Sequence, residues 1–158
     1  MELWLLRHAR ARAAASDEKD QDRPLTESGR ETARKLGEWI HSSGLTVPSA
    51  VRISSATRTR ETARLMLDGL EAPEQVVEPE LWEALEEDLI GVLHKNQKAE
   101  SLLLVGHNPG FEWLVQWLTN QRPRLGIQPG TLVIIDAEMP PAPGCGQIRK
   151  LVQPSDLT

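Results

Sequence analysis

The sequence predicts an α/β fold of three layers, in which a mostly parallel central sheet carries helices on both faces. Short apolar runs alternate along the chain with longer segments whose apolar residues recur at helical spacing. Two of the runs, Leu3–Leu6 and Leu102–Val105, end abruptly in polar residues, as a buried strand does at the edge of such a sheet. No repeat or linker interrupts the alternation, so we expect one domain over residues 1–158.

The first half of the chain contains two predicted strands and two predicted helices. The apolar run near the N-terminus predicts a strand over residues 2–7, and a polar loop follows at 11–23. Thr26 is a suitable N-cap for a helix that ends at Ser42-Ser43-Gly44. A second strand at 51–53 leads into a helix over about residues 58–70.

The second half predicts four strands and two helices. In order, these are a short strand at 75–78, a helix over 81–96, a strand at 102–105, a helix over 111–119, and strands at 130–136 and 146–152. The last two strands flank a loop rich in Pro and Gly and are interpreted as a closing hairpin.

Composition and charge exclude several classes of protein. A net charge of -5 argues against nucleic acid as the general partner. No apolar run approaches the roughly 20 residues of a membrane span, and the first strand begins at Glu2, which leaves no room for a signal or transit peptide. The single cysteine, Cys145, excludes an internal disulfide. We therefore expect a cytoplasmic protein that binds neither nucleic acid nor membrane.

An arginine and a histidine follow the first predicted strand directly, as Arg7 and His8. They stand at the edge of the sheet where open α/β folds bind ligands. Neutral imidazole is a usable nucleophile near pH 7, and an adjacent guanidinium both binds phosphate and disfavours the imidazolium form. A solvated strand end would explain the pair equally well if it stood alone.

Two further strand ends supply groups of the same kind. The strand at 102–105 is followed by Gly106 and His107. The strand at 51–53 is followed by Arg58 near a helix N-terminus, where backbone N–H groups already favour an anion. Three strand ends that each carry a phosphate-binding group predict one shared anion site, formed by Arg7, His8, Arg58 and His107.

A metal site built from His8, His107 and a carboxylate is an alternative use of the same residues. The flanking arginines would repel a cation, so we expect neither a metal ion nor another cofactor. Cys145 lies in a Pro- and Gly-rich loop with no base nearby in sequence, and we expect it to be inert.

These motifs together resemble the histidine phosphatase superfamily, whose first motif is Arg-His after strand one. The resemblance continues at four further segments, which are Asp22–Arg30, Ser54–Ala63, Pro79–Leu81 and Val105–Gly110. The first of these is similar to the family's Arg-Pro-Leu-Thr-x-x-Gly helix entry. The motifs follow the family's order and cover nearly the whole chain, and the close match is to the short SixA-type branch of phosphohistidine phosphatases. The resemblance implies a phosphoglycerate-mutase-like fold.

The candidate residues suit a metal-independent phosphatase that works in two steps. His8 attacks a phosphoryl group in line and becomes a transient phosphohistidine, which water then cleaves. Arg7, Arg58 and His107 are the partners of the negative charge on the equatorial oxygens. Because His8 must be neutral and His107 is most useful when protonated, we expect their pKa values to be pushed apart.

Three more residues have open roles at this stage. Larger members of the superfamily add an Asp or Glu that protonates the leaving oxygen, and Glu80 or Glu83 lies where such an acid could come from. The sequence does not decide between the two. Arg10 stands where many members begin a small polar run, and it either adds to the anion site or faces solvent.

The lack of a clear acid favours a substrate with a P–N bond, because a departing imidazole needs less protonation than an alkoxide. The chain also carries no insertion long enough to form a lid domain, which suits a phosphate displayed on another protein. We therefore expect a phosphohistidine substrate on a signalling or phosphotransfer protein. The alternatives are a small-metabolite phosphomonoesterase of the same fold and a non-catalytic module that binds phosphate or phosphoproteins.

Overall fold

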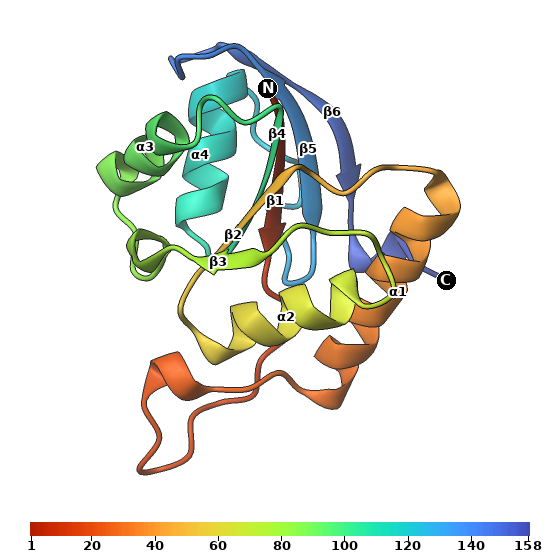
Figure 1. The fold of residues 1–158 in the computed structure, drawn as a ribbon. Helices are drawn as coiled ribbons and strands as arrows, with labels where there is room; N and C mark the ends of the chain where they lie inside the picture. Colours follow the sequence, from red (N-terminus) through yellow and green to blue (C-terminus); the bar gives the residue numbers. More distant parts are fainter.

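A six-stranded sheet with the strand order β3-β2-β4-β1-β5-β6 forms the centre of the protein (Figure 1). The computed structural model describes residues 1–158. The strands are β1 (Glu2–Arg7), β2 (Ala50–Ile53), β3 (Gln75–Val77), β4 (Ser101–Gly106), β5 (Leu132–Ala137) and β6 (Gly146–Val152). The first four pair in parallel, whereas β5 is antiparallel to both β1 and β6. The prediction of a mostly parallel sheet is confirmed, and the antiparallel closing hairpin forms one edge.

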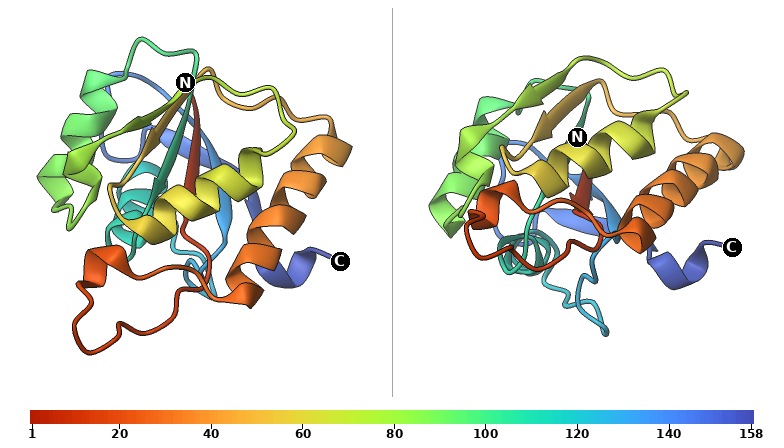
Figure 2. Two further views of the ribbon diagram at one scale, coloured as in Figure 1. Left: turned by 60° about the horizontal axis from the view of Figure 1, so that its bottom comes forward. Right: turned by 90° about the horizontal axis from the view of Figure 1, so that it is seen from below.

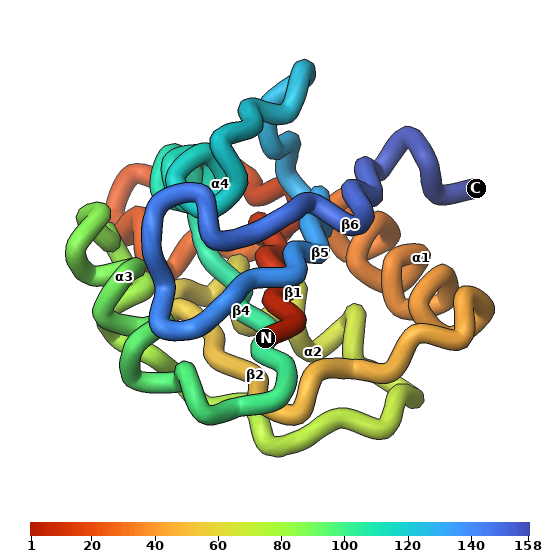
Figure 3. Tube along the Cα trace, turned by 90° about the horizontal axis from the view of Figure 1, so that it is seen from above, coloured from red at the N-terminus to blue at the C-terminus, as the bar shows by residue number.

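Four helices cover the two faces of this sheet. They are α1 (Glu27–Ser43), α2 (Thr57–Leu67), α3 (Glu86–Lys95) and α4 (Gly110–Thr119). Viewed along the sheet, α1 and α2 lie on one side of the strands and α3 and α4 on the other (Figure 3). Short 3-10 helices occur at Asp20–Asp22, Pro79–Leu81 and Pro154–Asp156. The predicted three-layer arrangement is therefore confirmed.

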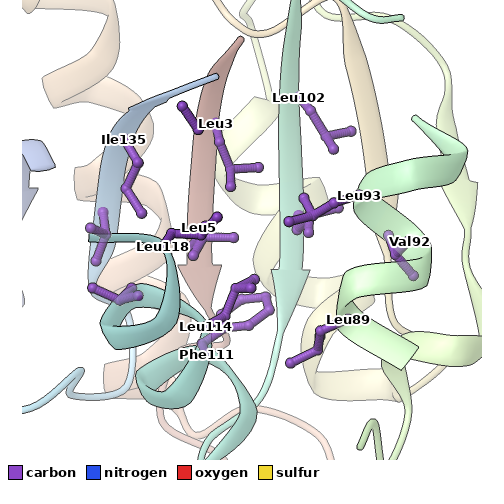
Figure 4. Close-up of a cluster of buried hydrophobic side chains, with 14 of the residues drawn as sticks. Leu3, Leu5, Leu89, Val92, Leu93, Leu102, Phe111, Leu114, Leu118 and Ile135 are labelled. Atoms are coloured by element: carbon purple, nitrogen blue, oxygen red, sulfur yellow. The ribbon is translucent and has the colours of Figure 1, made fainter. Parts of the chain in front are cut away.

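The apolar side chains of β1 pack against the helices on both faces of the sheet, because successive side chains of a strand point to opposite faces. Leu3 and Leu5 pack against α3 and α4, as Figure 4 shows for this side of the sheet. Trp4 and Leu6 pack against α1 and α2. All four side chains are inaccessible to solvent. A strand buried on both faces explains why its sequence shows no polar alternation.

Both ends of α1 agree with the sequence prediction. The Thr26 hydroxyl accepts a hydrogen bond from the Gly29 N–H at 3.0 Å, which makes it the N-cap. Gly44 follows the helix in the left-handed region, with φ of 73°. Gly29 also lies against the chain after β1, since a Cβ there would stand 2.2 Å from the Arg10 carbonyl oxygen. The start of α1 therefore fixes the path of the backbone just beyond His8.

Two helix boundaries differ from the prediction. The third helix begins at Glu86 and not at Leu81, because Pro79–Leu81 forms a 3-10 turn and Glu83 then adopts a left-handed φ of 51°. The second helix ends at Leu67, three residues before the expected end at Leu70, and Gly69 follows with φ of 77°. In both places a local turn ends a pattern of apolar residues that would otherwise continue a helix.

The carboxyl ends of β1, β2 and β4 meet at one edge of the sheet. Arg7 is paired with Gly106 in the β1–β4 ladder, and Ile53 with Val105 in the β2–β4 ladder. The loop of residues 11–23 lies outside this edge, as seen from below in the right panel of Figure 2. In addition, none of the helices has the length and apolar character that crossing a membrane requires.

Candidate active site

A cavity of about 500 Å³ opens at this edge of the sheet. The residues that line it come from the ends of β1 and β4, the loop that follows β1, the start of α2, the turn after Pro79–Leu81 and the loop before β5. They are Arg7, His8, Arg10, Ala11, Asp20, Arg23, Arg58, Trp82, Glu83, His107, Asn108, Pro109 and Pro129. The four residues that the strand ends predicted, Arg7, His8, Arg58 and His107, are thus brought together. Positively charged and imidazole groups dominate the lining.

His8 lies in the position that a nucleophile requires. Its Nδ1 lies 2.7 Å from the Ala9 carbonyl oxygen, which can only accept, so Nδ1 carries the proton of the neutral ring. The lone pair therefore belongs to Nε2. The imidazole is 9% exposed, and its burial lowers the pKa to about 4, with the nearby guanidinium groups adding to the effect. Near pH 7 the ring is neutral.

Arg58 contacts His8 directly. Its Nε–H donates to His8 Nε2 at 3.3 Å, while Nη1 donates to the Asp20 carbonyl oxygen at 2.8 Å and Nη2 to the Asp20 carboxylate at 3.3 Å. The residue stands in the first turn of α2, and its backbone carbonyl accepts from the Thr62 hydroxyl at 2.7 Å. That same hydroxyl accepts from the Ala9 N–H at 3.0 Å, so α2 and the chain after β1 are held together.

Arg7 approaches the cavity from the end of β1. Its Nη1 donates to the Ile127 carbonyl oxygen at 2.8 Å, and its Nε is buried without a partner in the protein. Desolvation lowers its pKa, and the carboxylate of Glu112 opposes this. Glu112 also accepts from the Ile127 N–H at 2.8 Å, which holds the loop before β5 against the site. The Arg7 Nε–H is therefore free to donate a hydrogen bond to an anion bound in the cavity.

His107 faces His8 across the cavity, with 5.3 Å between the ring centroids. Its Nε2 lies 2.7 Å from the Ser54 hydroxyl, and its Nδ1 is buried without a partner. Its pKa is lowered to about 3, mainly by burial and in addition by the neighbouring His8 and Arg58. The expectation that the two histidine pKa values are pushed apart is wrong for the free protein, because the same desolvation acts on both rings.

The roles of Glu80, Glu83 and Arg10 were left open by the sequence, and the structure shows which of the three line the cavity. Glu83 lines the cavity, whereas Glu80 is exposed and is not among the lining residues. Arg10 also lines the cavity with an exposed side chain. Of the two carboxylates considered, only Glu83 is therefore placed at the rim.

Several lining residues were missed by sequence reasoning. Asp20 and Arg23 enter from the loop 11–23, and the Arg23 Nε donates to the Asp20 carboxylate at 2.8 Å. The Arg-Pro-Leu-Thr motif already contained Arg23 and signalled a helix start, without indicating that the arginine borders the cavity. Asp20 carried no such signal, because loop residues come near the site only through the tertiary fold. Trp82 was not chosen as a site residue, although it lies between Glu80 and Glu83, which were both considered for the site.

The charges of the site suit an anion better than a cation. No group of three His, Cys, Asp or Glu side chains in the protein is arranged to hold a metal ion. His8 and His107 are close together, but Arg7, Arg58 and Arg23 border the same cavity. Desolvation and neighbouring guanidinium groups both favour the neutral imidazoles in the absence of an anion.

The family model of the histidine phosphatase superfamily (branch 1) matches residues 3–110, which include the ends of β1, β2 and β4. The chain belongs to this superfamily. The matched range contains His8, Arg7, Arg58 and His107, together with Glu83 and the loop 11–23.

Two curated proteins show sequence similarity to this chain over part of their length. A 2,3-bisphosphoglycerate-dependent phosphoglycerate mutase 2 from Gloeobacter violaceus is 38% identical over 94 residues, which are 58% of this chain and 40% of the mutase. An uncharacterised chloroplastic protein from Arabidopsis thaliana is 31% identical over 121 residues, which are 70% of this chain and 55% of the relative. The chain thus spans about half the length of the curated relatives that it matches.

Solved structures of the same fold match nearly the whole chain. A SixA protein histidine phosphatase in complex with tungstate superposes with a TM-score of 0.84 at 22% identity, covering 99% of each chain. An α-ribazole phosphatase from Shigella flexneri has a TM-score of 0.73 at 20% identity, covering 98% of this chain and 97% of the other. At these identities the likeness establishes the fold, which is the phosphoglycerate-mutase-like fold that the sequence predicted.

Proposed function

We propose that this protein is a phosphatase that uses His8 as its nucleophile, and that its substrate is phosphohistidine on another protein. One observation carries the proposal. The lone pair of His8 Nε2 lies in a cavity that Arg7, Arg58 and His107 border together. A nucleophile surrounded by donors on several sides matches the requirements of phosphoryl transfer, where attack and charge stabilisation occur at one phosphorus atom.

In the first step, His8 Nε2 forms a bond to phosphorus while the bond from phosphorus to the leaving nitrogen breaks. Arg7, Arg58 and the Nδ1 of His107 bind the three equatorial oxygens. In the second step, a water oxygen bonds to phosphorus, the bond to His8 breaks, and inorganic phosphate leaves. While a phosphoryl dianion is bound, its negative charge raises the pKa of His107, which burial lowers in the free protein. His107 can then donate a hydrogen bond to the dianion.

The choice of phosphohistidine rests on the leaving group and on the shape of the site. A departing imidazole needs little proton donation, and the site offers only the exposed Glu83 as a carboxylic acid outside the Asp20–arginine contacts. The loop 11–23 borders the cavity without a lid domain over it (Figure 2). The similarity to a SixA protein histidine phosphatase agrees with this choice.

A small-metabolite phosphomonoesterase is the second candidate. The observation in its favour is that Glu83 lines the cavity, where a carboxylic acid could protonate a departing alkoxide. The likeness to an α-ribazole phosphatase points the same way.

A substrate comparison distinguishes the two candidates. We would measure kcat/KM on a phosphorylated histidine-phosphotransfer protein and on phosphoimidazole, against a panel of sugar and nucleoside monophosphates. We expect the phosphohistidine substrates to be hydrolysed at least 100-fold more efficiently. The reverse order would establish the phosphomonoesterase instead.

Trapping of the intermediate tests the role of His8. Quenching with alkaline detergent during turnover of a ³²P-labelled substrate should trap a phosphoenzyme in the wild type, stable in alkali and lost on later acid treatment, and none in His8→Asn. A His8→Asn variant that is folded and retains turnover within tenfold would rule out the covalent mechanism. Tight tungstate binding without turnover on any substrate would instead indicate a phosphate-binding module.

A further inference from the structure

Trp82 contacts two members of the anion site that come from different strands. Its ring meets the His107 ring edge-on, with 5.3 Å between centroids and 76° between the planes. The guanidinium carbon of Arg58 lies 5.2 Å from the centroid of the same indole. Trp82 also lines the cavity, and it is the only Trp or Phe to do so. The indole thus connects the group that follows β4 with the group that follows β2.

The position of this ring is fixed by the backbone on both sides. Before it, Leu81 is 2% exposed and packs in the core next to α3, and the Trp82 N–H donates to the Pro79 carbonyl oxygen at 3.1 Å. After it, Glu83 takes the left-handed conformation and turns the chain away. An anchored residue followed by a sharp turn presents the indole to the site from a defined direction.

The two contacts add to a small set of other contacts that orient these groups. Apart from Trp82, the Arg58 guanidinium is held by His8, whose Nε2 accepts from its Nε–H, and by Asp20, which is an exposed residue of a long loop. The His107 ring is otherwise held through Ser54 at one nitrogen, with the second nitrogen unpaired. An aromatic face attracts a guanidinium, most strongly where water is excluded, and an aromatic pair prefers this edge-to-face geometry.

We propose that Trp82 is a positioning residue of the anion site, which holds Arg58 and His107 in the mutual orientation that binds the oxygens of a tetrahedral oxyanion. Donors that are already oriented lose less freedom when the anion arrives and are better placed as charge develops. The kinetic consequences rest on the proposed phosphatase function, whereas the consequences for oxyanion binding do not.

Trp82→Leu tests this inference by removing the ring while keeping an apolar side chain. Calorimetric titration with tungstate should show affinity reduced about tenfold. With phosphoimidazole as substrate, kcat should fall by about ten- to fiftyfold and KM should change by less than threefold, because the loss concerns mainly the charge that develops in the transition state. Trp82→Phe, which keeps an aromatic face, should restore most of both losses.

Trp39→Leu is the matched control. Trp39 also stacks with a cation, since the Lys150 ammonium lies 5.2 Å from its ring centroid, and it packs partly buried against the core away from the cavity. Its removal should lower the melting temperature and leave tungstate affinity and kcat within twofold of the wild type.

The inference is overturned if Trp82→Leu binds tungstate as the wild type does, or if Trp39→Leu loses as much affinity. It is also overturned if Trp82→Phe is as impaired as the leucine variant, which would indicate a loss of packing and not of aromatic contact. Should Trp82→Leu fail to fold, the comparison of Trp82→Phe with Trp82→Met supplies the same contrast. If the wild type binds tungstate but hydrolyses no substrate, the proposed phosphatase function is contradicted. The positioning role of Trp82 is still tested in that case, by the tungstate affinities of the variants.

Discussion

Arg58 donates its Nε–H to His8 Nε2 across 3.3 Å, so the nitrogen that is proposed to attack phosphorus already accepts a hydrogen bond in the free protein. The two remaining donor groups of Arg58 are directed to Asp20. In the proposed mechanism the phosphorus needs the lone pair of His8, and the phosphoryl oxygens need the guanidinium. The Asp20 carboxylate would then compete with a substrate oxygen for Arg58.

Asp20→Asn should strengthen oxyanion binding. The substitution removes a negative charge that competes for Arg58 and Arg23 while retaining the backbone carbonyl contact. We expect the inhibition constant of tungstate to fall about two- to fivefold, since surface charge pairs of this kind contribute about 1 kcal/mol or less. Asp22→Asn is the control, because this exposed residue belongs to the same short helix and does not line the cavity. An equal gain in both variants would mean that net charge alone is responsible.

Arg58→Ala should reduce kcat/KM by about 100-fold or more, which corresponds to about 3 kcal/mol of transition-state stabilisation. Arg60→Ala, an exposed position on the same helix that does not line the cavity, should stay within twofold of the wild type. Steady-state kinetics and tungstate inhibition measure both effects. Wild-type kinetics in a folded Arg58→Ala variant would remove this arginine from the proposed mechanism.

Acid should destabilise the fold through the two buried histidines. Their pKa values are lowered to about 4 for His8 and about 3 for His107, mainly by burial, against about 6.5 in an unfolded chain. Between these values the unfolded state binds more protons, so the free energy of unfolding falls as the pH is lowered from about 6.5 toward 3 and is unaffected by these groups above that range. Urea denaturation at several pH values measures the slope.

Substitution of either histidine should make that slope shallower. His8→Asn and His107→Asn each remove one group that takes up a proton on unfolding, whereas His94→Asn, at an exposed position, is the control that keeps the wild-type slope. Parallel curves for all four proteins would contradict the assignment of the acid sensitivity to the buried rings.

Glu83→Gln should separate the two classes of substrate. If the Glu83 carboxyl protonates a leaving oxygen, hydrolysis of alkyl phosphates falls by about 100-fold, because proton donation to an alkoxide contributes roughly 10² to 10⁴ in rate. Hydrolysis of phosphoimidazole should remain within a few-fold of the wild type. Glu80→Gln, which changes a carboxylate outside the cavity, should affect neither reaction. A 100-fold loss on phosphoimidazole in a folded Glu83→Gln variant would end the acid-independent mechanism.

Much of this site could be predicted from short stretches of sequence. Arg7 and His8 directly follow a buried strand, and Thr26 and Gly44 mark the ends of a helix through local backbone preferences. These features depend on neighbours along the chain. The alternation of strands and helices then requires a parallel sheet, and a parallel sheet brings the ends of its strands, and with them Arg58 and His107, to one edge.

The remainder was decided by tertiary structure. Asp20 reaches Arg58 because a long loop folds back over the sheet edge, and Trp82 reaches His107 because Leu81 is buried and Glu83 reverses the chain. That reversal also separates Glu83, at the cavity, from Glu80, outside it. The lowered pKa of His107 depends on how completely the assembled protein excludes water from the ring. Burial and contacts between distant segments are properties of the packed chain, so a local sequence pattern does not contain them.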